Sequence, residues 1–195
     1  MILIIGLGNP GQQYKNTPHN LGRETIENLA RILDFPEFKN NKKLSAEISK
    51  KNNLILAKPT TFMNESGMAV KKLLDYYQIS PVDCWIIHDD FDLPLEKIKI
   101  SVNRSSAGHN GAQSIIDNLK TKNFVRFRIG ARITSGKKSP TDLLAVRLEK
   151  ARQLVLKKFN SKNKILANNA IKLANQAIIV AIKKGVEKAM GEYNK

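Results

Sequence analysis

The chain has 195 residues, 42% of them hydrophobic, which is enough for one domain with a substantial core and argues against disorder. Lysine and arginine number 33 against 17 acidic residues, so the formal net charge is +16 and an extended polyanion is a natural partner. A single cysteine, Cys84, excludes an internal disulfide and a multi-cysteine zinc site. The start of the chain lacks the pattern of a signal peptide, and the longest apolar run, 177–182, is too short to cross a bilayer. We therefore expect a cytoplasmic protein with no membrane partner.

Strand and helix patterns alternate through the first 150 residues, which predicts an α/β fold. The apolar segment 1–5 predicts a buried strand, and 20–33 predicts a helix with Asn20 as a candidate cap. Strands are expected at 44–50 and 53–57. The short connection between them favours an antiparallel pair, so the sheet should be mixed.

The pattern continues with a helix at 66–77 and a strand at 84–87 that ends in the sequence His-Asp-Asp. Two further strands, 97–102 and 124–130, alternate basic and apolar residues and should each present a basic face. A glycine-flanked loop leads into a helix at 112–119, Ser139 predicts another helix start, and an amphipathic stripe from 165 to 182 ends at Gly185. We predict a single domain, 1–195, with a twisted mixed sheet between helices on both faces and a helical C-terminal part.

Gly6, Gly8 and Gly11 have the G-x-G-x-x-G spacing of dinucleotide-binding loops. The segment that follows, 12–18, has no helical apolar period and is broken by Pro18, whereas a dinucleotide fold begins a helix there. The acidic residue that should end a second strand is also missing. The glycines are therefore better explained by a tight turn that directs the Asn9 amide into a cleft. A nicotinamide-dependent oxidoreductase stays as the weaker alternative.

Polar side chains gather next to the ends of predicted elements. Asn9 accompanies His19 near the first strand, Asn64 starts a helix, and Asp89 follows a strand. An imidazole, a carboxylate and amides are the groups that hydrolysis by an activated water requires, because one takes a proton, one orients the imidazole and the others bind the carbonyl oxygen. His88 and His109 are candidate supporting groups.

Other chemistries fit less well. The chain has no G-x-S-x-G nucleophile elbow, and Cys84 lies inside an apolar strand where a thiol is usually inert. The acidic run at 89–92 lacks the spacing of known metal loops, so we expect no metal and no cofactor.

Five ordered blocks resemble the bacterial-type peptidyl-tRNA hydrolases. They are GLGNPG at 6–11, KPTTFMN at 58–64, HDDFDLP at 88–94, GHNG at 108–111 and RFRIG at 126–130. The resemblance runs from residue 1 to about 148 and returns near the C-terminus. One departure adjoins the site, since Pro18 stands where the family usually has an arginine.

The resemblance implies that His19 is the general base that activates water against the ester of peptidyl-tRNA, and that Asp89 supports it. It also implies that Asn9 separates N-blocked from free aminoacyl-tRNA. Asn64 and Asn110 would position the substrate, Tyr14, Phe62 and Met63 would line the cleft, and Arg104 and Arg128 would hold phosphates of the tRNA acceptor stem and 3′ end. A monomer without an obligate protein partner is implied as well. The alternative that stays open is a non-catalytic RNA-binding relative.

Overall fold

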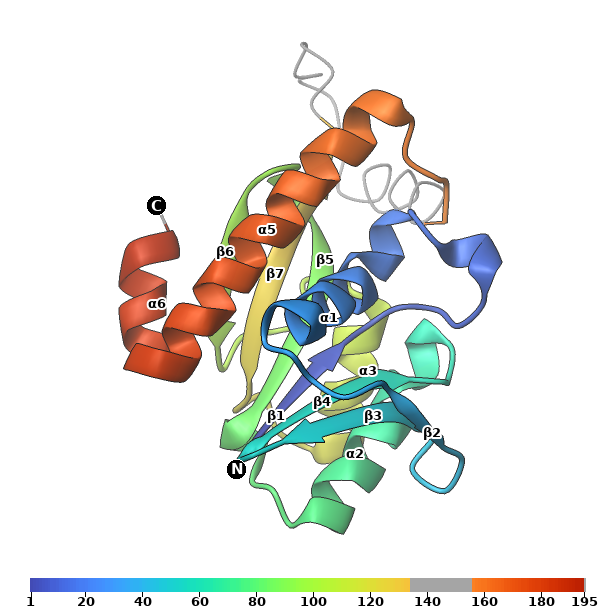
Figure 1. Ribbon diagram of the computed structural model, residues 1–195, viewed down its shortest axis with the longest axis vertical. Helices are drawn as coiled ribbons and strands as arrows, with labels where there is room; N and C mark the ends of the chain where they lie inside the picture. The colour runs from blue at the N-terminus through green and yellow to red at the C-terminus, as the bar shows by residue number, and fades with distance from the viewer. Residues whose placement is uncertain (134–155, 195) are drawn as a thin grey trace.

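The computed structural model describes residues 1–133 and 156–194. Its centre is a seven-stranded sheet in the order β2-β3-β4-β1-β5-β7-β6. The strands are β1 (Ile2–Gly6), β2 (Lys39–Asn41), β3 (Ala46–Lys51), β4 (Leu54–Pro59), β5 (Cys84–Pro94), β6 (Ile98–Val102) and β7 (Val125–Arg132). The helices are α1 (Leu21–Ile32), α2 (Ser66–Tyr77), α3 (Asn110–Leu119), α5 (Ser161–Lys184) and α6 (Val186–Tyr193). Figure 1 shows α1 and α5 in front of the sheet and α2 and α3 behind it.

The sheet is mixed, as the short connection between the third and fourth strands predicted. β1 pairs in parallel with β4 and with β5, and β5 pairs in parallel with β7. The β2-β3-β4 part and the β6-β7 edge are antiparallel. The chain leaves β1 toward one side through α1 and reaches the other side through α2, so the carboxyl ends of β1 and β5 mark the point where open α/β sheets place their binding sites.

Two apolar layers hold the helices to the sheet. The layer on the α1 side contains Ile4, Leu29, Trp85 and Phe127 and the inward-facing stripe of α5. The layer on the α2 and α3 side contains residues of β1, β4 and β5 with the alternate facing, among them Leu3 and Ile86. By length and composition α5 is a candidate membrane span. Its alanines and Ile178 belong to the first core layer, however, so here it packs as the core helix of a globular fold.

The glycines of the dinucleotide-like spacing serve packing and turning. A Cβ on Gly6 would meet the Gly22 carbonyl oxygen at 2.3 Å, so Gly6 lets α1 lie close against β1. A Cβ on Gly8 would meet the Asn20 amide oxygen at 2.9 Å, and Gly11 has φ of 105°, which favours glycine. In place of the helix that a dinucleotide fold requires, 12–14 form one turn of 3₁₀ helix.

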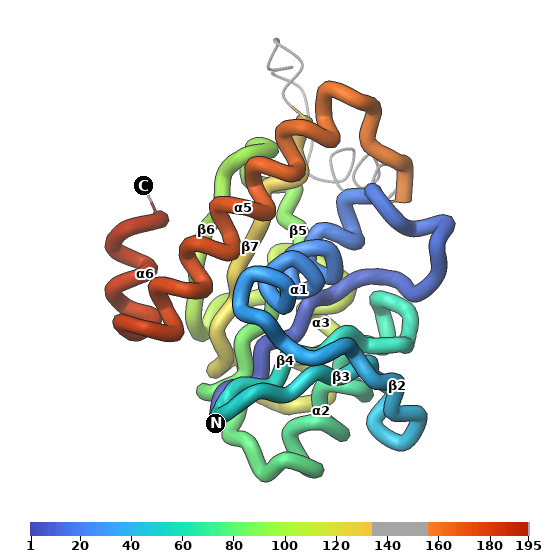
Figure 2. The backbone as a smooth tube through the Cα atoms, in the orientation of Figure 1, coloured from blue at the N-terminus to red at the C-terminus, as the bar shows by residue number. Residues whose placement is uncertain are grey.

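Residues 7–20 run out past the sheet before α1 begins, and Figure 2 shows this segment beside the chain that enters α5. The Phe159 amide donates to the Asn16 carbonyl oxygen at 2.9 Å and joins the two segments. Pro18, the departure from the family pattern, is the first residue of a buried 3₁₀ turn, Pro18–Asn20. Its fixed φ suits that position, so Pro18 pre-sets the backbone that carries His19.

Three sequence predictions require correction. β5 extends to Pro94, so 88–90 lie within a strand and not after one. The short edge strand β2 has no apolar alternation and was not predicted. Asn20 precedes α1, but its side chain makes no capping hydrogen bond. The helix start predicted at Ser139 lies outside the described residues.

Candidate active site

The candidate site forms where β5 extends beyond the end of β1. β1 ends at Gly6, which pairs with Ile87, and the next amide, that of Leu7, still donates to the Ile87 carbonyl oxygen at 3.0 Å. Beyond Ile87, β5 stays paired with β7, where Asp89 lies opposite Ile129. The other side of β5 is therefore free to receive the segment that carries His19.

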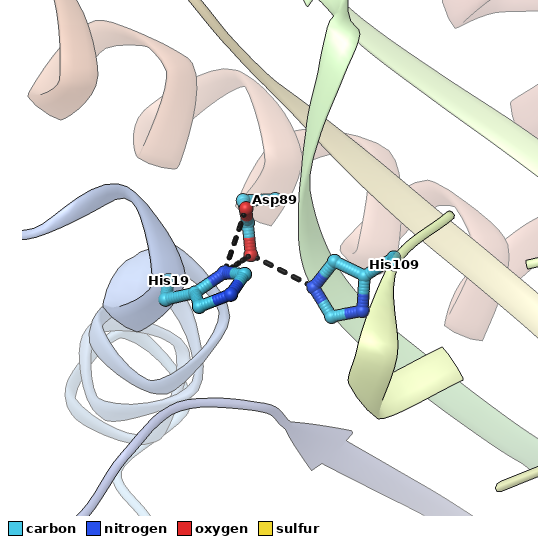
Figure 3. A group of neighbouring side chains, drawn as sticks. All are labelled: His19, Asp89 and His109. Carbon is cyan, nitrogen blue, oxygen red and sulfur yellow. Dashed lines mark hydrogen bonds and ion pairs between the residues drawn. The ribbon is translucent and has the colours of Figure 1, made fainter. Parts of the chain in front are cut away.

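A carboxylate lies between two imidazoles at this point (Figure 3). His19 Nδ1 is 3.0 Å from both Asp89 oxygens, and His109 Nε2 is 2.9 Å from Asp89 Oδ1. Asp89 has no exposed surface, and His19 is 8% exposed. Since His19 precedes α1 and His109 precedes α3, the two layers of helices and the sheet each contribute one of the three groups.

The partners of each ring assign its tautomer. The Ala112 backbone N–H donates to His109 Nδ1 at 3.1 Å, so Nδ1 carries the lone pair and Nε2 carries the proton that goes to Asp89. His109 is thus the side-chain N-cap of α3. His19 donates from Nδ1 to Asp89, which leaves the lone pair of a neutral His19 on Nε2.

The charges of His19 and Asp89 shift each other's pKa values in opposite directions. Burial alone disfavours the charged imidazole, but the Asp89 charge and hydrogen bond outweigh it and raise the pKa of His19. Burial likewise opposes the charged form of Asp89, but the two histidines lower its pKa, so the carboxyl stays ionised. An ionised carboxylate that orients a histidine is the arrangement that general-base chemistry uses.

His88 supports this cluster from the neighbouring side of β5. Its ring centroid lies 4.4 Å from that of His109, and its Nδ1 donates to the Asp89 carbonyl oxygen at 2.6 Å. Burial first, and then His109 and Arg126, lower the pKa of His88 well below its usual value, so the ring is neutral. The ring therefore packs against His109 without adding a charge.

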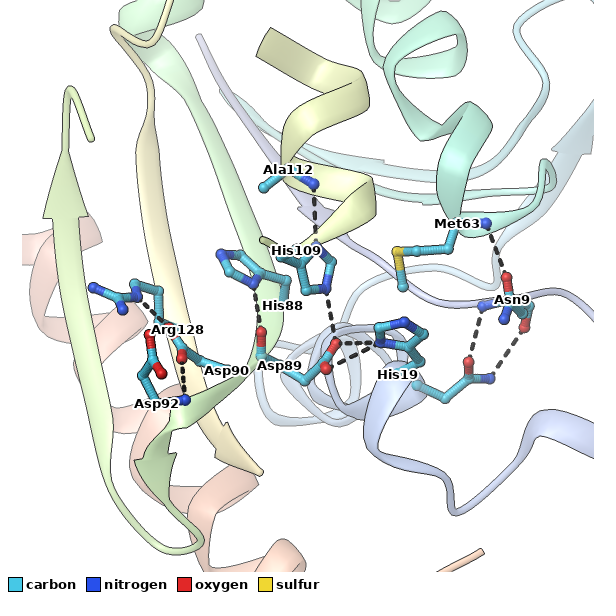
Figure 4. Close-up of polar contacts among 11 residues, drawn as sticks. Asn9, His19, Met63, His88, Asp89, Asp90, Asp92, His109, Ala112 and Arg128 are labelled. Carbon is cyan, nitrogen blue, oxygen red and sulfur yellow. Dashed lines mark hydrogen bonds and ion pairs between the residues drawn. The ribbon is translucent and has the colours of Figure 1, made fainter. Parts of the chain in front are cut away.

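Asn9 is held by its neighbours, as Figure 4 shows for its bond to Met63. Asn20 Oδ1 accepts from the Asn9 backbone N–H at 2.8 Å, and Asn20 Nδ2 donates to the Asn9 carbonyl oxygen at 3.1 Å. The Asn9 side-chain oxygen accepts from the Met63 N–H at 2.8 Å. These three bonds fix the Asn9 amide and leave its Nδ2 hydrogens for other acceptors. Asn20, which follows His19 in the sequence and was also a candidate helix cap, is therefore the side chain that holds the Asn9 backbone.

The other predicted site residues surround this centre at different depths. Tyr14 and Phe62 form an edge-to-face pair with ring centroids 6.5 Å apart, and Phe62 is 52% exposed. Met63 is buried, whereas Asn64, within the 3₁₀ turn Met63–Glu65, and Asn110, the first residue of α3, are exposed.

The predicted basic face needs a correction. Arg126 is 2% exposed and donates from Nη2 to the Ser105 carbonyl oxygen at 2.6 Å, so it tethers the loop before His109 and is not a surface contact. Arg128 is partly exposed and binds Asp90 Oδ2 at 2.5 Å. Arg104, Lys97 just before β6 and Lys99 within it are exposed.

The fold and this cluster define a class, an α/β protein whose sheet end holds the groups that general-base chemistry requires. Comparison with known sequences then gives the family. The profile of the peptidyl-tRNA hydrolase family matches residues 3–195. A peptidyl-tRNA hydrolase of Thermodesulfovibrio yellowstonii is 42% identical over the whole of both chains, and one of a Sulfurihydrogenibium species is 37% identical over 98% of this chain and 96% of its own.

Solved structures agree with the sequence relatives. The crystal structure of peptidyl-tRNA hydrolase from Acinetobacter baumannii matches with a TM-score of 0.86 at 31% identity, over 100% of this chain and 94% of that one. A crystal structure of a peptidyl-tRNA hydrolase complex with n-propanol matches with the same TM-score at 32% identity, over the same shares of the two chains. The chain belongs to the peptidyl-tRNA hydrolase family.

Proposed function

We propose that this protein hydrolyses the ester bond between an N-blocked peptidyl group and the 3′-terminal ribose of tRNA. The observation that carries the proposal is the hydrogen bond of His19 Nδ1 to the buried Asp89 carboxylate, which leaves Nε2 with a lone pair. Family membership supplies the substrate class, because the relatives are named for it.

In this mechanism His19 Nε2 takes a proton from water, and the resulting hydroxide attacks the ester carbonyl carbon. Asp89 stabilises the imidazolium that forms. The tetrahedral intermediate collapses when the bond to the ribose oxygen breaks, and that oxygen takes the proton back from His19. No covalent enzyme intermediate and no cofactor is required.

Amides beside the base orient the substrate. Because the Asn9 oxygen is occupied by the Met63 N–H, its Nδ2 group is directed as a donor toward a peptidyl carbonyl. A free aminoacyl group has no such carbonyl, so Asn9 favours N-blocked substrates. Asn64 and Asn110 contribute further amides, and Tyr14, Phe62 and Met63 line the cleft.

Substrate binding depends on the charge of the chain. With a formal net charge of +16, the protein attracts tRNA. Arg104, Arg128 and the exposed lysines at the β6 edge, Lys97 and Lys99, contact phosphates without reading sequence. We place this activity in the cytoplasm, in a monomer with no obligate protein partner.

The test compares N-acetyl-aminoacyl-tRNA with free aminoacyl-tRNA as substrates of the purified protein, with EDTA in a parallel sample. We expect the blocked substrate to be cleaved in both samples and the free one to be cleaved poorly. His19→Ala should reduce cleavage by at least about 100-fold, the lower end of general-base contributions, while it retains tRNA binding. Near-normal turnover of that variant would overturn the mechanism, and no turnover by the unaltered protein would favour the non-catalytic RNA-binding alternative.

A further inference from the structure

The cluster that orients His19 also has the composition of a transition-metal site. Among the described residues, one ligand atom each of His19, Asp89 and His109 lie within 4.8 Å of one another. The nitrogens that face the carboxylate are His19 Nδ1 and His109 Nε2. We propose that this cluster binds Zn²⁺ or a similar borderline-soft dication, and that the bound metal inhibits the hydrolysis. This inference rests on the proposed function, because the inhibition acts on the His19 base.

The distances suit a small dication. Zinc binds imidazole nitrogen and carboxylate oxygen at roughly 2.0–2.2 Å, so tetrahedral ligand atoms stand about 3.3–3.5 Å apart. The nitrogen–oxygen pairs here are 3.0 and 2.9 Å apart, so each needs to open by only a few tenths of an ångström. Three protein ligands leave one coordination position for water or substrate, as in zinc sites that are not closed.

The ligand types select among metals. Two imidazoles and one carboxylate suit zinc, copper and nickel, whereas Mg²⁺ prefers oxygen ligands in octahedral geometry. The Mg²⁺ that accompanies tRNA should therefore not bind to this cluster. The neighbouring His88 is turned to another partner, because its Nδ1 atom donates to the Asp89 carbonyl oxygen. Cys84 lies at the other end of β5 and takes no part in this group.

Metal binding reverses both tautomers. A metal on His19 Nδ1 displaces the proton there, and the neutral ring then carries that proton on Nε2. A metal on His109 Nε2 likewise moves the proton of that ring to Nδ1. Asp89 is already ionised, so the metal gains three ligands without any net release of protons from them.

The first of these changes accounts for the inhibition. The lone pair that takes the proton of water sits on His19 Nε2, and the tautomer shift replaces it with an N–H group. Asp89, which stabilises the imidazolium during hydrolysis, is at the same time occupied by the metal. The metal thus removes the base without entering the substrate cleft.

The second change reduces affinity. His109 Nδ1 accepts the Ala112 N–H as the N-cap of α3, and a protonated Nδ1 loses that bond. Loss of a side-chain N-cap destabilises the start of the helix, so metal binding is opposed by part of the stability of α3. The site is therefore expected to release its metal to chelators such as EDTA.

The test starts from EDTA-treated protein, returned to chelator-free buffer, that cleaves N-acetyl-aminoacyl-tRNA. Buffered Zn²⁺ should inhibit it saturably, and calorimetry without tRNA should find one Zn²⁺ per chain. Long-range ¹H–¹⁵N spectra of the imidazoles should show the proton of His19 move from Nδ1 to Nε2. Mg²⁺ at the same concentrations should produce neither the inhibition nor the spectral change.

Two variants make the assignment specific. His109→Asn keeps an N-cap acceptor for α3 but lacks the imidazole ligand, so its zinc dissociation constant should rise by at least about tenfold, the smallest loss expected even when a supporting partner of a ligand is removed. Cys84→Ala removes the chain's thiol and should bind zinc as the unaltered protein does.

The outcomes separate the two proposals. Absence of saturable binding, equal zinc affinity of His109→Asn and the unaltered protein, or inhibition without a tautomer change would each overturn the metal site. Faster hydrolysis with zinc would also overturn it, since the cluster would then activate water through the metal. Failure of the EDTA-treated protein to cleave the ester would instead contradict the proposed function, whatever zinc binding shows.

Discussion

Asp89 accepts hydrogen bonds from two histidines, and the two bonds have different consequences. The bond from His19 engages Nδ1 and leaves the lone pair on Nε2, and the bond from His109 joins the carboxylate to the start of α3. The negative charge on Asp89 also raises the pKa of His19, against the effect of burial. Orientation and proton affinity of the base thus depend on one side chain.

The pH profile should show this dependence. The proposed mechanism requires neutral His19, so kcat/KM should fall as the pH drops through the His19 pKa, which lies above the ordinary value of 6.5. In Asp89→Asn the charge is gone and burial remains, so the acid limb should move to lower pH. The maximal rate should also fall by about 100-fold or more, because an amide can hold His19 in the wrong tautomer. An unmoved acid limb would show that another group titrates.

Asn20 offers a second test at this scale. Asn20→Ala leaves the buried backbone N–H and C=O of Asn9 without partners, which costs about 1–3 kcal/mol for each group. We expect a lower free energy of unfolding and weaker discrimination between N-blocked and free aminoacyl-tRNA in a kcat/KM assay. Asn175→Ala is the control, since Asn175 is equally buried but bonds to Asn28, away from the site. If both variants discriminate normally, Asn20 is only structural.

From the sequence, the proximity of His19 to Asp89 was easier to predict than the groups that hold the two side chains in place. A histidine and an aspartate near strand ends are recognisable by residue type, because few other roles need both. Asn20, in contrast, has a sequence position that fits a helix cap, and only its distance from Asn9 shows what it holds. The same holds for Arg126, whose place in an alternating strand suggested exposure although a loop covers it.

Helices α2 and α3 cross so closely at Gly67 that there is no room for a side chain at that position. A Cβ on Gly67 would meet the Ser114 carbonyl oxygen at 2.0 Å, and the Gly67 N–H donates to Ser114 Oγ at 3.0 Å. Because His109 caps α3, this crossing determines where one donor of the Asp89 cluster stands.

Gly67→Ala should therefore act on both stability and rate. Overpacking of this kind costs about 1–3 kcal/mol, and a displaced α3 moves His109, so kcat should fall as well. Gly191→Ala is a matched control, because nothing lies within 4 Å of a Cβ there and α6 should gain up to about 1 kcal/mol from helix propensity. Denaturant unfolding and steady-state kinetics measure the two effects. Unchanged kcat in Gly67→Ala would separate the crossing from catalysis.

At the level of elements, periodicity placed the long helices and most strands. The helix predicted at 66–77 has the bounds of α2, and the stripe that ends at Gly185 is α5. The extent of β5 was not predictable, since His-Asp-Asp has poor strand propensity and is held extended by pairing with β7. Tertiary contacts of this sort do not appear in local patterns.

Basic side chains lie at both edges of the sheet, so they do not all have the same opportunity to bind a polyanion. Arg104, Lys97 and Lys99 are exposed near the β6 edge of the sheet, whereas Lys50 lies on β3 toward the opposite edge. Arg128 forms an ion pair with Asp90, so its positive charge is partly neutralised within the protein. Net charge therefore predicts attraction to a polyanion but not the binding face.

The salt dependence of tRNA binding should locate that face. If Arg104 neutralises a phosphate, Arg104→Ala should reduce the slope of log affinity against log salt by about 0.7–0.9, the value for one contact. Lys50→Ala removes the same charge from the opposite edge and should leave the slope unchanged. Binding of non-hydrolysable tRNA to both variants over a salt series measures this. Equal slopes for Arg104→Ala and the unaltered protein would exclude that contact.

The three layers of the fold meet at Asp89, with His19 from the α1 side, His109 from the α3 side and the carboxylate from the sheet between them. A shift of a few tenths of an ångström already weakens the hydrogen bonds of this cluster, whereas the same shift in a close-packed apolar layer removes only part of the free energy of unfolding. The rate of hydrolysis should consequently respond to smaller changes in the distance between helices and sheet than the melting temperature does. Changes far from the cleft that thicken or thin either layer should appear first as lost turnover in a protein that is still fully folded.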